Sequence, residues 1–114
     1  MANVQLFDVH KADVVSNNID INAALAASLA SDYKYYVRVT DPVAEDVEVF
    51  KAAKLFKHRP DEVKIGKIKM SWGYGWLYDI VRNGRPIHSG SWYPEILEEL
   101  GEEDVLYISP VPVH

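Results

Sequence analysis

The chain of 114 residues has the usual length of a single domain. Hydrophobic residues make up 48% of it and charged residues 25%, which excludes a disordered protein and indicates a buried core. Cysteine is absent, so disulfides, thiolate zinc sites, iron–sulfur clusters and cysteine nucleophiles are all excluded. We therefore expect one domain over residues 1–114.

The formal net charge of −5 conceals an uneven distribution of charged residues. Residues 1–50 carry 3 basic and 8 acidic side chains, residues 51–94 carry 9 and 3, and residues 95–114 carry 0 and 6. Such segregation can mark a surface that recognises a partner. The other interpretation is that the acidic and basic segments are neighbours in the fold and neutralise each other, which is commoner on short chains.

The first third of the chain predicts a strand, a helix and a second strand. Alternation over Val4–Val9 favours a strand, and apolar residues recur at every fourth position between Asp20 and Asp32, which predicts a helix. Either Asn18 or Asp20 can cap the start of that helix. Aromatic and β-branched residues over Tyr33–Thr40 then predict a strand.

A second helix is expected after this strand, with Asp41 as its N-cap and Pro42 at its first position. It should end before Pro60, because residues that precede proline avoid the α region. The segment Val47–Phe50 alternates like a strand, so whether it is helix or strand stays open.

The segment Val63–Trp72 predicts a strand whose alternation changes phase near Gly66. Apolar residues occupy odd positions before that point and even positions after it, which a β-bulge near residues 66–67 would explain. The residues Gly73–Gly75 are then expected to form a turn.

The strongest local signal is Asn83-Gly84 between two strand-like segments, which is typical of a type I′ β-hairpin. A two-residue turn implies a register in which the residue numbers of each pair add up to 167. Pro86 cannot donate a hydrogen bond to a neighbouring strand, so it places the second strand at a sheet edge. The predicted core face carries Trp76, Tyr78, Ile80 and Ile87. The predicted pairs are Trp76 with Ser91, Leu77 with Gly90, Tyr78 with Ser89, Asp79 with His88, Ile80 with Ile87, Val81 with Pro86, and Arg82 with Arg85.

Near the end of the chain, Pro94 favours the start of a short helix that Gly101 should end. A final strand is predicted over Val105–Ser109, stopped by Pro110 and Pro112. The expected class is therefore α+β, with a mainly antiparallel sheet of about five to six strands and two to three helices packed on it.

Catalytic and cofactor signatures are weak in this sequence. The histidines His10, His58, His88 and His114 lack metal-ligand spacing, and no phosphate-binding loop is present, so we expect neither a metal nor a cofactor. In the predicted register Asp79 lies across from His88, which would suit general acid–base chemistry, although a simple cross-strand ion pair is the commoner outcome.

Basic and aromatic residues alternate over residues 64–93, a pattern that suits a nucleotide or single-stranded nucleic acid. Two like charges, Arg82 and Arg85, should meet at the hairpin tip, where an anion or acidic partner would offset their repulsion. The candidate nucleic-acid contacts are Lys64, Lys67, Lys69, Arg82, Arg85, Tyr74 and Trp92.

We expect a non-catalytic binding protein of the inhibitor, immunity or adaptor type, which recognises a partner protein through a charged, aromatic-bearing surface. Nucleic-acid binding is the alternative, and an acid–base hydrolase using His88 and Asp79 is a weaker one. The edge strand could also pair with a second copy of the chain. The candidate binding residues are Arg82, Arg85, His88, Lys67, Lys69, Tyr74 and Trp92.

Nothing in the sequence favours secretion or membrane insertion. Residues 23–30 imitate part of a signal peptide, but no basic segment precedes them and polar residues interrupt the apolar region. No apolar run approaches the ~20 residues of a transmembrane helix. We therefore expect a soluble cytoplasmic protein.

Overall fold

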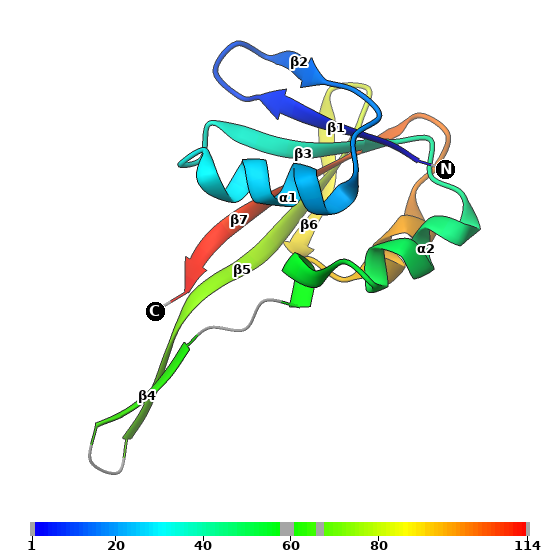
Figure 1. Cartoon of the computed structure of the whole chain (residues 1–114). Helices are drawn as coiled ribbons and strands as arrows, with labels where there is room; N and C mark the ends of the chain where they lie inside the picture. The colour runs from blue at the N-terminus through cyan, green and yellow to red at the C-terminus, as the bar shows by residue number, and fades with distance from the viewer. Residues whose placement is uncertain (1, 58–60, 66–67, 114) are drawn as a thin grey trace.

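The computed structural model describes residues 2–57, 61–65 and 68–113, and among these the side chains of residues 2–56 and 75–110. Its fold is α+β, as predicted, with an antiparallel sheet backed by helices (Figure 1). No helix in the described ranges has the length and apolarity needed to cross a membrane. The elements are β1 (Asn3–Asp8), β2 (Asp13–Ser16), α1 (Ile21–Ala30), β3 (Tyr35–Thr40), α2 (Ala44–Lys51), η1 (Lys54–Lys57), β4 (Asp61–Ile65), β5 (Ile68–Arg82), β6 (Arg85–Ser91), η2 (Pro94–Glu99) and β7 (Asp104–Val113).

Six strands form the body of the sheet in the order β2-β1-β3-β7-β5-β6, and every neighbouring pair is antiparallel. The remaining strand, β4, pairs with the first part of β5 and extends away from the body (Figure 1). The strand β6 pairs only with β5 among the described residues, so the prediction that Pro86 marks an edge strand is confirmed.

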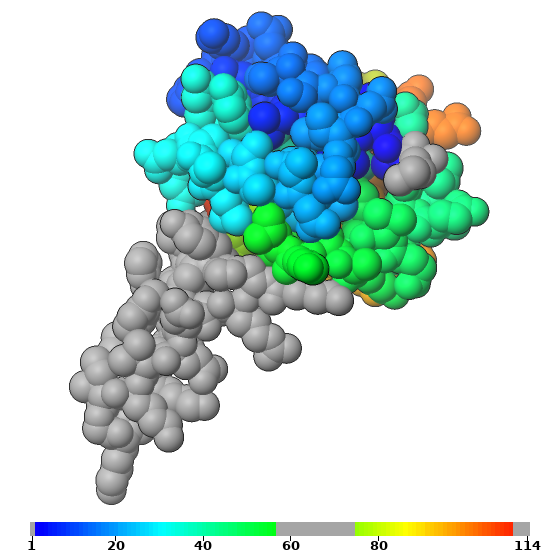
Figure 2. Space-filling view, viewed as in Figure 1, coloured from blue at the N-terminus to red at the C-terminus, as the bar shows by residue number. Residues whose placement is uncertain are grey.

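Both α-helices lie on one face of the sheet, and together they cover much of the near side of the body (Figures 1 and 2). Strand alternation sends every second side chain toward them, which creates a single core between the two layers. The core includes the predicted residues Trp76, Tyr78 and Ile80. Besides Ile80, the largest fully buried apolar side chains are Leu25, Val37, Val39, Phe50, Ile96, Leu106 and Ile108.

The start of α1 agrees with the sequence, because the Asp20 carboxylate accepts a hydrogen bond of 3.2 Å from the Ala23 backbone N–H. The helix ends at Ala30, with Ser31 as its C-cap, close to the end that the sequence indicates at Asp32. Asp32 and Tyr33 have positive φ angles of 53° and 67°, which an α-helix cannot contain. The strand β3 consequently begins at Tyr35.

The segment Val47–Phe50 is helical, which resolves the question left open by its alternation. The prediction that Asp41 caps α2 is wrong, because the N-cap is Val43 and Asp41 has a positive φ of 53°. A residue within α2, Asp46, provides the side chain that caps the start of the helix. One oxygen of the buried Asp46 carboxylate accepts from the Val43 N–H and from the Ala2 N–H, each at 2.7 Å.

Residues Gly73–Gly75 lie within the 15-residue strand β5, so the predicted turn is wrong. The phase change near Gly66 also has another cause, because β4 and β5 are separate strands in which Val63 pairs with Met70 and Ile65 with Ile68. This register places odd positions of one strand opposite even positions of the other. Residues 66 and 67 themselves lie outside the described part of the chain.

The turn at Asn83-Gly84 is confirmed, since both residues have positive φ angles of 50° and 77°. The predicted register holds for Arg82 with Arg85 and for Val81 with Pro86, and then shifts by one residue. The other predicted pairs are therefore wrong, and Ile87 is 38% exposed rather than part of the core. The observed pairs are Ile80 with His88, Asp79 with Ser89, Tyr78 with Gly90, and Leu77 with Ser91.

The shift has a local cause in the edge strand. Pro86 has no N–H with which to continue the ladder, and a bulge at an edge leaves its extra residue in solvent at little cost.

The strand β7 runs to Val113, so the prediction that Pro110 and Pro112 stop it is wrong. Its pairing with β3 covers only Leu106–Ile108, whereas β5 pairs with it along its whole length. From residue 109 onward β7 therefore has its described partner on one side only. Prolines are tolerated there because the missing N–H groups can face the free edge.

Two further elements differ from the sequence-based expectation. The hairpin partner β2 was not predicted, and the turn before it is held by the Asp8 carboxylate, which accepts from the His10 and Lys11 N–H groups at 3.0 Å each. The helix after Pro94 is a 3-10 helix that ends at Glu99 rather than at Gly101.

Replacing Asp46 by alanine should lower the free energy of unfolding by about 1–3 kcal/mol, because two N–H groups lose their acceptor. Urea denaturation followed by circular dichroism measures this loss. The variant Asp46→Asn is the matched control, since its amide oxygen can still accept a hydrogen bond and the loss should be smaller. Equal losses in both variants would contradict the capping role.

Candidate functional site

The hairpin tip is built differently from the sequence-based expectation, because Arg82 has its own carboxylate. Its guanidinium donates two hydrogen bonds to the buried side chain of Asp104, from Nε to Oδ1 at 2.7 Å and from Nη2 to Oδ2 at 3.1 Å. The Gly101 N–H donates to the same Oδ2 at 2.9 Å. Arg85 does lie opposite Arg82, but the bidentate pair with Asp104 already offsets the Arg82 charge.

The ion pair changes the acidity of both partners. The hydrogen bonds from Arg82 and from the Gly101 N–H lower the pKa of the Asp104 carboxyl, and the carboxylate in turn raises the pKa of Arg82. The need for an external anion at this tip is correspondingly weaker, although both Arg82 and Arg85 are exposed.

The other predicted binding residues do not converge on one surface. His88 is exposed on β6 opposite Ile80, and Asp79 faces Ser89, so the register does not bring Asp79 and His88 together as an acid–base pair. Trp92 is partly buried against the core. The backbone positions of Lys64, Lys69 and Tyr74 are on β4 and β5, their side chains lie outside the described ones, and Lys67 lies outside the described residues.

The segregated charges of the sequence meet in the fold. Arg82 pairs with Asp104, and the Lys51 Nζ lies 3.3 Å from a Glu95 carboxylate oxygen, so the basic middle segment contacts the acidic C-terminal segment twice. These contacts favour the interpretation of mutual neutralisation over that of a single basic surface.

The sheet presents a second face, opposite the helices, which no helix in the described ranges covers (Figure 1). We call it the open face. It carries the side chains that alternate with those of the core, and several of them are large and apolar. Its central residues are Gln5 and Phe7 on β1, Tyr36 and Arg38 on β3, Tyr107 on β7, and Leu77, Asp79 and Val81 on β5.

Aromatic rings from three adjacent strands gather on the open face, namely Phe7, Tyr36 and Tyr107. We call these three residues the aromatic row. Phe7 pairs with Tyr36 in the ladder, and its ring meets that of Tyr107 edge to face, with centroids 5.3 Å apart. Each residue comes from a different strand, so the row depends on the strand order.

Hydrogen bonds hold one end of the aromatic row in place. The Arg38 guanidinium lies over the Tyr107 ring, with 6.0 Å to the centroid, and its Nε donates to the Tyr107 hydroxyl at 3.3 Å. Its Nη1 donates to the Gln5 side-chain oxygen, and the Gln5 Nε2 donates to the Asn17 Oδ1 at 2.6 Å. The chain of contacts fixes the side-chain rotamers before any partner arrives.

Two hollows flank the row and share Tyr36 and Asp79, which stand between them. The larger hollow has a volume of about 520 Å³ and the smaller about 280 Å³. The larger is lined by Tyr33, Leu77, Tyr78, Ser89, Gly90, Ser109 and Pro110, and the smaller by Phe7, Val9, Val81, Pro86 and Tyr107.

The sequence does contain a signal for the open face. Tyr36 and Arg38 alternate with Val37 and Val39, so the centre of β3 has aliphatic side chains on one side and large amphipathic ones on the other. Tyr107 interrupts Leu106 and Ile108 in the same way. Aromatic residues at outward positions of several strands could have indicated a binding surface.

The described residues contain no group of three or more histidine, aspartate or glutamate side chains that could hold a metal ion. Comparisons with family models, curated proteins and solved structures found no match to this chain. Functional inference therefore rests on the geometry of the surfaces.

Lowering the pH should destabilise the protein through Asp104. Because the Asp104 pKa is lower in the folded state than in an unfolded chain, its stabilising effect is present above the ordinary carboxyl pKa of about 3.9 and is lost as the pH falls through the folded value. Urea midpoints measured from pH 7 to pH 2.5 should fall more steeply in the native protein than in Asp104→Asn.

The variant Glu103→Gln is the matched control, because it removes an exposed carboxylate from the adjacent position. It should keep the acid dependence of the native protein. If Asp104→Asn and the native protein lose stability in parallel below pH 4, the ion pair does not contribute in the way described.

Proposed function

We propose that this protein is a non-catalytic binding protein of the inhibitor, immunity or adaptor type, and that its partner protein docks on the open face. The observation that carries this proposal is the aromatic row, held at its Tyr107 end by a hydrogen bond from Arg38, on a sheet face that no described helix covers. A sheet normally buries one face and can leave the other in water, but exposed faces are then mostly polar. Here the uncovered face carries half-buried aromatic rings instead.

The composition of the open face is that of a protein interface. Tyrosine and arginine are the residue types that most often dominate binding energy, and Tyr36, Tyr107 and Arg38 stand at its centre. Leu77, which is 42% exposed, and Val14, which is 37% exposed, extend the apolar area along the same face. Rotamers fixed in advance reduce the entropy that binding costs.

Asp79 gives the open face its electrostatic preference. Its carboxylate stands between the two hollows, whereas the nearby Arg38 is already engaged by Gln5 and Tyr107. A partner that places a basic or hydrogen-bond-donating group opposite Asp79, surrounded by apolar side chains, suits this arrangement. The absence of cysteine supports a cytoplasmic setting for the interaction.

Single-stranded nucleic acid is the second candidate, because rings on adjacent strands of an open antiparallel sheet are how several RNA-binding domains stack bases. The charge weighs against it, since the protein has a net charge of −5 and Asp79 is central to the face. An oligonucleotide that binds with steep salt dependence and loses affinity on Tyr107→Ala would favour this candidate instead.

A second copy of the chain is a further possible partner. All seven residues of β6 are exposed, and this strand pairs only with β5 among the described residues. Light scattering at micromolar concentration tests whether the edge pairs with itself.

The proposed contact can be tested by site-specific photocrosslinking in an extract of the native cells. A benzoylphenylalanine that replaces Tyr36 or Leu77 should give the same discrete adduct, because both positions lie on the open face. The control position is Ala26, which is exposed on α1 at the other layer and should not give that adduct. Adducts that do not depend on the position would contradict the proposal.

Once the adduct is identified, Tyr107→Ala should weaken binding to that partner at least about tenfold, the size typical of a central interface tyrosine. Arg85→Glu tests the hairpin tip separately without disturbing the ion pair of Arg82 with Asp104. Unchanged affinity in Tyr107→Ala together with a large loss in Arg85→Glu would move the interface to the tip.

A further inference from the structure

A separate pocket lies on the helix side of the sheet, between α2 and η2, with a volume of about 420 Å³. We call it the helix-side pocket. Aromatic side chains dominate its walls, and they come from two distant parts of the chain, residues 50–56 and 92–94. The lining residues are Phe50, Lys51, Phe56, Trp92, Tyr93 and Pro94.

The walls of the helix-side pocket are held in place by ring contacts. The Phe56 and Trp92 centroids lie 4.8 Å apart at an interplanar angle of 34°, and Phe50, which is fully buried, lies 6.1 Å from each of them. Behind them the Trp76 Nε1 donates to the Leu55 carbonyl at 2.9 Å. Tyr93 stands at the mouth and is 45% exposed.

The one cation in the wall, Lys51, has more negative than positive charge around it. Its Nζ lies 3.3 Å from a Glu95 oxygen and 3.6 Å from a Glu48 oxygen. The hydrogen bond that Lys51 donates to Glu95 and the negative charge of Glu48 both raise the Lys51 pKa. The two carboxylates therefore reduce the repulsion that Lys51 would exert on a cation in the pocket.

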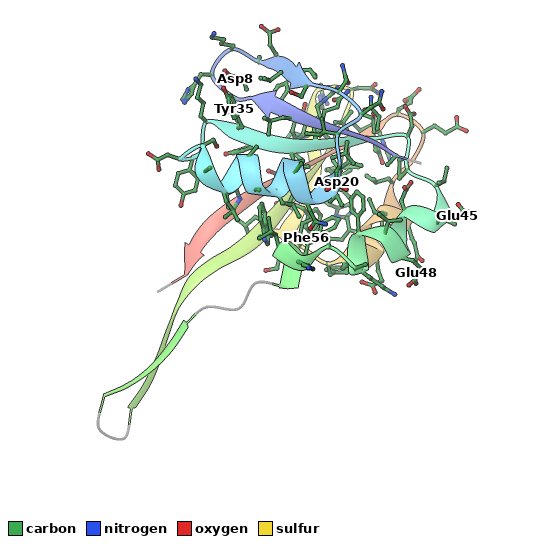
Figure 3. The ribbon with its side chains drawn as sticks, in the orientation of Figure 1. Asp8, Asp20, Tyr35, Glu45, Glu48 and Phe56 are labelled. Carbon is green, nitrogen blue, oxygen red and sulfur yellow. The ribbon has the colours of Figure 1, made fainter. Side chains whose placement is uncertain are left out.

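The elements that supply the pocket walls carry more exposed acidic side chains than basic residues. Lys51 is the only basic residue in α2 and η2, and η1 adds Lys54 and Lys57, whereas α2 and η2 carry five exposed carboxylates. Figure 3 shows two of them, Glu45 and Glu48, projecting from α2, while Phe56 lies toward the interior. The five carboxylates belong to Glu45, Glu48, Glu95, Glu98 and Glu99.

We propose that the helix-side pocket binds a basic side chain, lysine or arginine, presented by a partner protein. Aromatic rings attract cations through the negative potential of their faces, and apolar walls suit the methylene stem of a basic side chain. The surplus of carboxylates on α2 and η2 attracts the same ligand and repels anions. An uncharged apolar side chain would gain binding free energy only from its contacts with the apolar walls.

Trp92 adds a second feature that a peptide ligand would suit. Its Nε1 is buried and has no hydrogen-bond partner among the described residues. A buried donor without an acceptor is costly, and a peptide supplies carbonyl oxygens that can accept the bond. The Trp92 indole N–H signal is also a direct reporter of events at the pocket.

Titration with capped tripeptides Gly-Lys-Gly and Gly-Arg-Gly, followed by the Trp92 indole N–H signal in NMR spectra, tests the proposal. The matched control is Gly-norleucine-Gly, which has the apolar stem of lysine without its charge. The basic peptides should bind about fivefold or more tightly than the control, the ratio typical of a cation against aromatic faces.

Two charge variants are expected to change the peptide affinity in opposite directions. Lys51→Met removes the cation from the wall and should tighten binding of Gly-Lys-Gly by about threefold or more, while Glu95→Gln should weaken it by a similar factor. Glu103→Gln, which makes the same charge change away from the pocket, should alter affinity much less. A merely structural role of Lys51 would not make the affinity rise.

Three results would overturn the proposal: equal or tighter binding of the norleucine peptide, no shift of the Trp92 signal with any peptide, or equal effects of Glu95→Gln and Glu103→Gln. The assay uses no partner of the open face, so its failure and the failure of the proposed function are distinguishable.

Discussion

The antiparallel ladder between β5 and β7 covers ten residue pairs, from Gly73 opposite Val113 to Arg82 opposite Asp104. Its register decides which side chains enter the core and which reach the open face. Tyr78 with Ile108 and Ile80 with Leu106 point toward the helices, so Asp79 with Tyr107 must point away from them. A shift of one residue would exchange the two faces, and the bidentate pair at the Arg82 end opposes such a shift.

From this ladder the two candidate surfaces follow as opposite sides of one layered structure. The open face gathers the aromatic row because β1, β3 and β7 are neighbours and their outward positions coincide. The helix-side pocket forms where η1 and the segment after β6 close over Phe50. The surfaces differ in charge as well, since α2 and η2 beside the pocket carry five exposed carboxylates, whereas the open face carries half-buried rings with Asp79 between its two hollows.

The charge distribution of the chain takes on a different meaning in the fold. The basic middle segment seemed suited to nucleic acid, yet Arg82 and Lys51 are both paired with carboxylates of the C-terminal segment. The five exposed carboxylates of α2 and η2 outnumber the one lysine of these two elements. Both proposals therefore point to partners that carry basic groups, although they place those groups on opposite faces.

The sequence alone determined the features that depend on neighbouring residues. The turn at Asn83-Gly84, the edge position of Pro86 and the burial of Ile80 all follow from local conformation or short-range alternation, and the same local patterns limited the first helix cap to Asn18 or Asp20. These effects act within a few residues, so a single sequence can reveal them.

Only the tertiary structure decided the rest. The bulge that moves Ile87 into solvent, the prolines of β7, the pair of Arg82 with Asp104 and the meeting of Phe7 with Tyr107 all depend on which strands are neighbours. Strand order arises from contacts between residues far apart in the chain, whose free energy no local pattern encodes. The binding surfaces belong to this second group because each is assembled from several distant segments.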